Sequence, residues 1–186
     1  MRPSPIVAPG REDFQRKLEN ARRPRGNCMT TFLLKPIGVI RSEIKNTAEA
    51  PLFYDEGAPN AFLELDPAFA GGLLRMRPGD EIIVLTWLHL AKTDVLQVHP
   101  RGDTANPLTG VFSTRSPARP NPIGLHRTKV LAIDGMRLHV GPIEAIDGTP
   151  VIDIKPVMAE FLPRGPVRQP AWSHELMQGY WEPVKK

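Results

Sequence analysis

The 186-residue chain has little cysteine, no long apolar run and no net charge over most of its length. Its single cysteine, Cys28, excludes an internal disulfide framework and any zinc site that needs paired thiolates, and it fits a reducing compartment. The longest apolar runs, such as residues 82–85, are far shorter than the roughly 20 residues of a membrane helix, and the amino terminus lacks the apolar core of a signal peptide. We therefore expect a soluble, cytoplasmic protein with no membrane segment and no bound metal.

The excess positive charge lies at the amino terminus. The formal charge of the chain is +4, but residues 1–30 hold seven Lys/Arg against three Asp/Glu, whereas residues 31–186 hold 17 of each. A neutral body does not exclude a nucleic-acid ligand, because recognition depends on how charge clusters on one face. We expect residues 1–29 to be a flexible basic extension, residues 30–165 to be the folded domain, and residues 166–186 to be a tail with a short helix.

Proline and glycine, in contrast, are abundant. The 21 prolines and 15 glycines divide the chain into short elements, which disfavours a helical bundle. Short apolar and β-branched runs bounded by Pro, Gly and Asp predict strands, and residues 67–75 are the one helix expected in the body, kept short by a Gly-Gly pair. The predicted fold is mostly β: a small closed or nearly closed β-barrel of about seven or eight short strands with few short helices. The expected strands fall within residues 32–42, 61–65, 81–90, 94–98, 110–113, 128–133, 137–140 and 151–154.

The densest group of polar residues is the segment 110–129, GVFSTRSPARPNPIGLHRTK, which we expect to be a loop between two strands. Its three prolines restrict the backbone, so the loop is stiff before any ligand binds. Arg115 and Arg119 can present planar guanidinium groups to phosphate or carboxylate. The alternative is a rigid loop whose arginines only bridge neighbouring acidic residues.

A second group lies in the segment 147–155, DGTPVIDIK, where a turn leads into a strand. Asp153 and Lys155 are two residues apart on that strand, so their side chains lie on the same face. They can pair with each other or face a cleft.

The histidines give a weaker signal. His89, beside Trp87 at the end of an expected strand, is either a hydrogen-bonded core residue or part of an aromatic rim that stacks on a base. His99, His126 and His139 lack the spacing of metal ligands. The chain also lacks the GxSxG, phosphate-loop and GxGxxG motifs, which removes the usual support for a hydrolase, a nucleoside triphosphatase or a Rossmann enzyme.

Three segments resemble, in order, the signatures of one known family. PIGVIRS at residues 36–42, GVFSTRSPARPNPIGL at 110–125 and DGTPVIDIKP at 147–156 are similar to those of the TsaA-like (TrmO-type) small β-barrel S-adenosylmethionine-dependent methyltransferases, whose best-known members modify tRNA. The resemblance covers about residues 32–157. It implies an enzyme that methylates N6 of N6-threonylcarbamoyladenosine beside the tRNA anticodon, and a homodimer that binds S-adenosyl-L-methionine near the subunit interface.

The resemblance implies the donor-binding residues, and the chemistry of methyl transfer to RNA suggests candidates for the other roles. Asp147 or His89 is the candidate acceptor for the N6 proton, and Arg119, Asn121 and Lys155 are expected to contact the substrate. The expected donor-binding residues are His89, Leu90, Arg115, Leu125, Asp147, Gly148, Thr149 and Pro150, with Pro51, Leu52 and Phe53 as a first wall.

The chain departs from the family pattern in two places. Pro51-Leu52-Phe53 stands where many members have Pro-Arg-Gln. Because only about thirty residues follow the DIKP motif, we also expect the protein to lack the extra carboxyl-terminal domain of the longer members. Two other functions therefore stay open: a methyltransferase for another RNA or a small molecule, and a non-catalytic RNA-binding module that needs only the basic loop and an aromatic platform.

Overall fold

The structure is a computed structural model that describes residues 33–54 and 56–176. The expected basic extension and the last part of the expected tail lie outside these residues. Among the described residues, no helix has the length and apolar character needed to cross a membrane.

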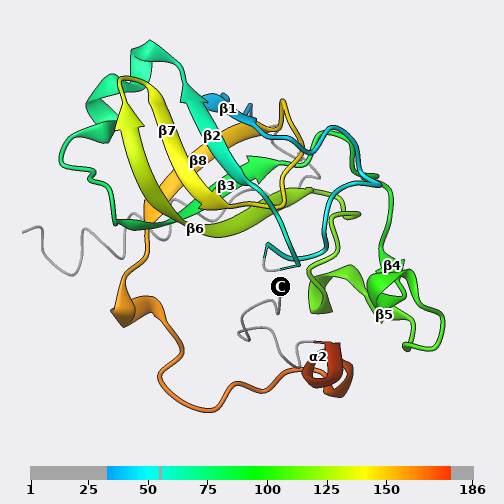
Figure 1. The fold of residues 1–186 in the computed structure, drawn as a ribbon. Coiled ribbons are helices and arrows are strands. Elements are labelled where there is room, and N and C mark those ends of the chain that lie inside the picture. The colour runs from blue at the N-terminus through cyan, green and yellow to red at the C-terminus, as the bar shows by residue number, and fades with distance from the viewer. Residues whose placement is uncertain (1–32, 55, 177–186) are drawn as a thin grey trace, which may run out of the picture. The chain divides into compact units, whose positions relative to one another are not determined.

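Six strands close into an antiparallel barrel in the order β1-β2-β7-β6-β3-β8, and two short strands pair separately (Figure 1). The prediction of a mostly β fold with a small barrel is confirmed, with six of the eight strands in the barrel. The strands are β1 Gly38–Arg41, β2 Asn60–Leu65, β3 Glu81–Trp87, β4 Gln97–Val98, β5 Thr109–Gly110, β6 Ile123–Asp134, β7 Arg137–Pro142 and β8 Pro150–Pro156.

The helices are short. The expected helix after β2 is the 3₁₀ helix η1, which begins with Asp66 Oδ1 accepting from Ala68 N at 2.8 Å. The prediction of a strand at 110–113 is wrong beyond Gly110, because residues 111–113 turn into a 3₁₀ helix in which Thr114 N donates to Val111 O. Within the described residues the helices are η1 Pro67–Leu73, η2 Pro100–Gly102, η3 Val111–Ser113, η4 Ala159–Phe161 and α2 Ala171–Leu176.

Alternate residues of the strands fill the barrel. In β2 and β3 every second side chain is buried, as the period of two in a strand requires. Burying one such side chain contributes about 1.5–3 kcal/mol. The largest core residues with almost no exposed surface include Ile40, Leu63, Ile82, Val84, Leu138, Val140 and Val151.

Strand β6 begins five residues earlier than predicted, so the expected loop 110–129 ends before Ile123. Seven residues of β3 pair with β6, from Glu81 with Lys129 to Trp87 with Ile123. The inward positions of this stretch are Gly124, His126 and Thr128, which are small or polar. The usual apolar alternation is therefore reversed, which is why the sequence resembled a loop.

Strand β3 ends at Trp87, three residues before the expected end. The ladder with β6 stops where Pro122, which has no N–H to donate, comes opposite Leu88. Leu88 N donates instead to Pro122 O at 2.8 Å, and the chain turns, with His89 and Leu90 exposed in the turn. The prediction that His89 ends a strand is therefore wrong.

The topology gathers one set of connections at one end of the barrel. There, Trp87 pairs with Ile123, Thr86 with Val151 and Val39 with Pro150. The segments that follow β1 and β3 and those that precede β6 and β8 therefore leave the barrel at the same end.

Candidate active site

The turn at residues 147–150 is fixed to the end of β1 by backbone hydrogen bonds. Gly148 N donates to Ile40 O at 2.8 Å, and Ile40 N donates to Thr149 O at 2.9 Å. Gly148 has a φ of +78°, in the left-handed region that favours glycine, and the buried Thr149 hydroxyl donates to Ile146 O at 2.6 Å. The turn is thus a continuation of the barrel, with Pro150 as the first residue of β8.

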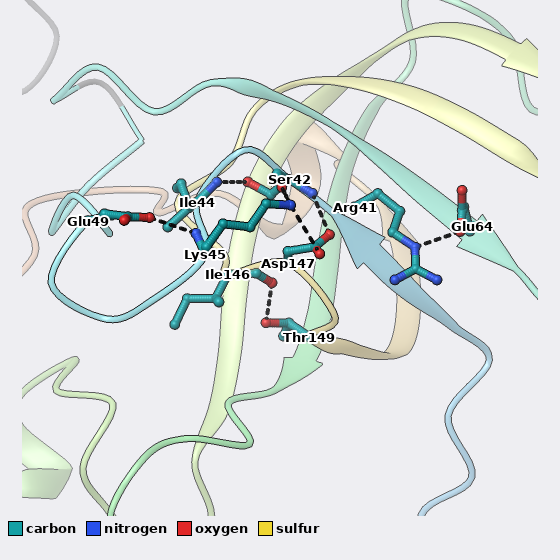
Figure 2. Close-up of polar contacts among 9 residues, drawn as sticks. All are labelled: Arg41, Ser42, Ile44, Lys45, Glu49, Glu64, Ile146, Asp147 and Thr149. Atoms are coloured by element: carbon teal, nitrogen blue, oxygen red, sulfur yellow. Dashed lines mark hydrogen bonds and ion pairs between the residues drawn. The ribbon is translucent and has the colours of Figure 1, made fainter.

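The carboxylate of Asp147 is held from two sides. Its Oδ1 accepts from Ser42 N at 3.1 Å, and Lys45 Nζ lies 3.2 Å from Oδ2 (Figure 2). The hydrogen bond from Ser42, with the hydrogen bond and charge of Lys45, holds the pKa of Asp147 below its ordinary value. The group is therefore ionised at neutral pH and is a weak proton acceptor, so its chemistry suits hydrogen bonding to a ligand better than general base catalysis.

The sequence reasoning missed the segment that supplies Lys45. Lys45 Nζ also donates to Ser42 O at 2.8 Å, and its backbone N–H donates to Glu49 Oε2 at 2.8 Å. That backbone hydrogen bond, together with one from the Asn46 side chain, lowers the pKa of Glu49. An isolated lysine in a polar segment gives no sequence signal. Lys45 meets Asp147 only because β8 pairs with β1, which places the turn before β8 next to the segment after β1.

Arg119 organises the loop at residues 111–122. Its Nε donates to Ser116 O at 2.7 Å, and its Nη2 donates to Thr114 O at 2.7 Å and Val111 O at 3.1 Å. Its backbone N–H donates to Lys92 O at 3.1 Å. The guanidinium thus bridges loop carbonyls rather than acidic residues, and its Nη1 group is the part left for a ligand.

Arg115 and Leu125 come together. Arg115 is exposed, and its Nη2 donates to Leu125 O at 3.2 Å. Leu125 lies on the outer face of β6, opposite Leu85 of β3, and 45% of its surface is exposed. Asn121 is also exposed, and its carbonyl accepts from Ile123 N.

The turn with His89 and Leu90 lies against the same loop. Hydrogen bonds on either side of it, from Leu88 N to Pro122 O and from Arg119 N to Lys92 O, tie it to residues 111–122. Leu90 is 57% exposed. His89 is therefore an exposed residue at the end of the barrel, not a core histidine.

The expected first wall is clamped by a residue that the sequence did not suggest. Leu52 N donates to Glu56 Oε2 at 3.1 Å, and Arg101 Nη2 pairs with Glu56 Oε1 at 2.8 Å. The Arg101 guanidinium also lies 5.2 Å from the centre of the Phe53 ring. The segment that begins at Pro51 lacks the arginine of the family's Pro-Arg-Gln pattern. The guanidinium group of Arg101, which belongs to another loop, lies beside this segment instead.

Lys155 is not brought to the other candidates. It pairs with Ile83, towards the opposite end of the barrel, and its Nζ lies 2.7 Å from Asp153 Oδ2. Of the two alternatives for Asp153 and Lys155, the structure contains the ion pair.

A buried polar chain links three elements close to the site. Thr86 Oγ1 lies 2.9 Å from His126 Nε2, and His126 Nδ1 lies 2.8 Å from Glu144 Oε1. Burial raises the pKa of Glu144, but the hydrogen bond and charge of His126 outweigh it and hold that pKa below its ordinary value. The spacing of the histidines gave no sign of this chain, and only the polar residues at inward positions of β6 could have suggested it.

Metal ligands do not cluster in the part of the chain that the structure describes. Within residues 33–54 and 56–176, no three His, Cys, Asp or Glu side chains come close enough together to hold an ion.

Comparison with known proteins assigns the family. The model of the tRNA-methyltransferase O N-terminal domain matches residues 39–161. A probable S-adenosyl-L-methionine-binding protein of Pyrococcus horikoshii is 42% identical over 128 residues, which cover 67% of this chain and 81% of that protein. An S-adenosyl-L-methionine-binding protein of Archaeoglobus fulgidus is 43% identical over 127 residues, which cover 67% of this chain and 88% of that protein.

The fold agrees with this assignment. A crystal structure of TrmO from Pseudomonas aeruginosa matches with a TM-score of 0.61 and 25% sequence identity, over 86% of this chain and 78% of that one. The matched residues 39–161 include all of the barrel except Gly38, and every segment at its site end described above. The chain therefore belongs to the family of the tRNA-methyltransferase O N-terminal domain, whose members are S-adenosylmethionine-dependent methyltransferases.

Proposed function

We propose that the protein transfers the methyl group of S-adenosylmethionine to N6 of N6-threonylcarbamoyladenosine beside the anticodon of tRNA. One observation carries the proposal. The segments that hold the residues matched to the family's donor site leave the barrel at one end, although they lie as much as about a hundred residues apart in the chain. Family membership supplies the methyl donor, and the tRNA nucleoside is the part that the proposal adds.

The residues at this end fit a donor that has both charged and apolar parts. Asp147 is ionised and can accept hydrogen bonds from hydroxyl or ammonium groups, and Arg115 can donate to a carboxylate. Leu90 and Leu125 offer exposed apolar surface. We assign the methyl donor to Asp147, Gly148, Thr149, Pro150, Arg115, Leu125, His89 and Leu90, with Pro51, Leu52 and Phe53 as the first wall.

The reaction is an in-line displacement that needs no covalent nucleophile. S-adenosylmethionine supplies an activated methyl group, and the protein must hold the accepting nitrogen about 3–3.5 Å from it and exclude water. The acyl substituent makes the N6 proton more acidic, so a nearby acceptor can take it. Because Asp147 is hydrogen-bonded and paired, we assign it to donor binding and His89 to the N6 proton.

We assign Arg119 Nη1 and the exposed Asn121 to the RNA, because both lie in the loop that carries Arg115. Lys155 was expected there too. Its position towards the far end of β8, in an ion pair with Asp153, favours a structural role for this residue instead.

We also propose that the protein acts as a homodimer. Ile123 and Leu125 are 46% and 45% exposed on the outer face of β6, and they lie opposite Trp87 and Leu85 of β3. An exposed apolar face of this kind is typical of an interaction surface, and a twofold partner would cover the same face on both copies. Light scattering should give twice the monomer mass, and the monomer mass at all working concentrations would contradict the dimer.

Two measurements test the function. Calorimetry should detect binding of S-adenosylmethionine or its demethylated product with a micromolar dissociation constant, which corresponds to a binding free energy of about 8 kcal/mol. Mass spectrometry of tRNA nucleosides should show the N6-methylated form of N6-threonylcarbamoyladenosine in cells with the gene and not in cells without it. Donor binding without that nucleoside would favour another RNA or a small molecule as substrate, and absence of donor binding would favour the RNA-binding module.

A further inference from the structure

The polar chain of Thr86, His126 and Glu144 includes inward positions of β3 and β6, where apolar side chains are the rule. Thr86 lies on β3, His126 on β6 and Glu144 in the segment between β7 and β8. Thr86 has no exposed surface and His126 has 5%. These elements are far apart in the sequence. The hydrogen bonds among the three side chains therefore fix the relative positions of the elements, in addition to the backbone hydrogen bonds between strands.

The hydrogen bonds have a defined direction. Glu144 is ionised at neutral pH and can only accept, so His126 Nδ1 carries a hydrogen and donates to Oε1. The backbone of β6 at Gly124 packs directly against the hydrogen-bonded side chains of Thr86 and His126, since a Cβ on Gly124 would collide with Thr86 Oγ1 and His126 Nε2. The strand is thus built closely around these side chains.

The polar chain is a costly way to fill this space. Glu144 Oε2 is buried and has no hydrogen-bond partner among the described residues, and an unsatisfied buried acceptor costs free energy. Apolar residues of similar volume often replace a buried charged pair with no loss of stability. Stability alone therefore does not explain why charged and polar side chains occupy these buried positions.

Two of the three residues lie next to the two halves of the proposed donor site. His126 follows Leu125, whose carbonyl accepts from Arg115 at 3.2 Å. Glu144 lies three residues before Asp147, and the charge of Arg115 also acts on Glu144. The hydrogen bond between His126 and Glu144 therefore joins the Arg115 half of the site to the Asp147 half, and Thr86 holds His126 from the opposite side of its ring.

We propose that Thr86, His126 and Glu144 are positioning residues that hold Arg115 and Leu125 in register with the Asp147 turn for the methyl donor. None of the three has to touch the donor, since their effect passes through Leu125 and the segment 145–147. This inference rests on the proposed function, because it concerns the affinity of that same site.

Substitutions at Thr86 separate positioning from packing. Thr86→Val keeps the shape but removes the hydroxyl that bonds His126, whereas Thr86→Ser keeps the hydroxyl and loses a methyl group. We expect Thr86→Val to weaken S-adenosylmethionine binding about tenfold in calorimetry and Thr86→Ser to stay within about threefold of wild type. The matched control is Glu81→Gln, which disturbs the exposed ion pair of Glu81 and Arg127 on the same two strands and should leave the affinity unchanged.

The outcomes are distinct. Equal donor affinity in Thr86→Val and wild type would overturn the inference, as would losses that follow the melting temperatures of all the variants, the control included. If Thr86→Val does not fold, Glu144→Leu against Glu144→Gln decides, because glutamine keeps the acceptor for His126 and should restore the affinity that leucine loses. A folded wild-type protein that does not bind S-adenosylmethionine would overturn the proposed function itself, and this inference with it.

Discussion

The two segments that flank the proposed donor site are held in different ways. The turn at residues 147–150 is fixed by backbone hydrogen bonds to β1, so its shape belongs to the barrel. The loop at residues 111–122 is fixed largely by one side chain, because Arg119 bonds three of its carbonyls. The shape of the turn should therefore survive most side-chain substitutions, while the shape of the loop should depend mainly on Arg119.

The largest effect should follow removal of that residue. Arg119→Ala loses three hydrogen bonds from a charged group, each worth about 1.5 kcal/mol or more. If about 3 kcal/mol of that loss reaches ligand binding, the affinity falls about a hundredfold. Because the loop carries Arg115, we expect both S-adenosylmethionine and tRNA affinity to fall. Arg119→Lys should restore little, since an ammonium group lacks the planar fork.

A matched control for Arg119 lies near the end of the described chain. Arg164 also donates to a backbone carbonyl, that of Glu160 at 3.3 Å, but at an exposed position outside the site. Arg164→Ala should leave both affinities unchanged. If Arg119→Ala weakened tRNA binding alone, Arg119 would be an RNA contact only, and the difference between loop and turn would lose its main support.

Arg115 should show a smaller and more selective effect. It makes one hydrogen bond, to Leu125 O, and leaves the rest of the loop in place. We expect Arg115→Ala to weaken donor binding by about 1.5–3 kcal/mol, the range for hydrogen bonds to charged groups, with tRNA affinity nearly unchanged. Calorimetry with each ligand measures this, and equal losses for both ligands would mean that the loop acts as one unit.

Two glycines test the comparison at the backbone. Gly148 in the turn has a φ of +78°, whereas Gly110 at the start of the loop has a φ of −61°, and a Cβ at either position would meet no atom within 4 Å. Gly148→Ala should therefore cost about 1 kcal/mol or more through strain alone, and Gly110→Ala should be neutral or slightly stabilising. Thermal unfolding measures both, and equal effects would mean that the turn is not held in its left-handed conformation.

The barrel could be predicted from the sequence where inward residues are apolar, and not where they are polar. Alternation in β2 and β3 gave those strands directly. In β6 the inward residues Gly124, His126 and Thr128 reverse the pattern, so the sequence predicts a loop in the first half of the strand. The sequence of β6 alone cannot reveal that the inward His126 finds its hydrogen-bond partners, Thr86 and Glu144, on other elements.

The same distinction holds for the candidate site. Family motifs supplied Asp147, Arg115 and Leu125, because those residues lie within the motifs themselves. Lys45 and Arg101 lie outside the motifs, and they reach the site only through the paths of the loops after β1 and after β4. Glu144 pairs with His126, 18 residues earlier in the sequence. The closure of the barrel brings the two together, and no motif with a fixed spacing predicts such a contact.

The smallest expected effect concerns the Asp147 carboxylate and its dependence on pH. Because hydrogen bonding from Ser42 lowers its folded-state pKa below the ordinary value, its contribution to stability is present above the unfolded-state pKa and is lost as pH falls through the folded-state value. Asp147→Asn keeps the acceptor for Ser42 but not the charge that faces Lys45, so it should be slightly less stable than wild type at pH 7, and the difference should shrink at an acid pH below the folded-state pKa. Urea unfolding of both proteins at the two pH values measures this, and the acid titration of Glu49, present in both, largely cancels. A difference that persisted at acid pH would mean that asparagine disturbs the turn itself, and the turn would then depend on a side chain as the loop does.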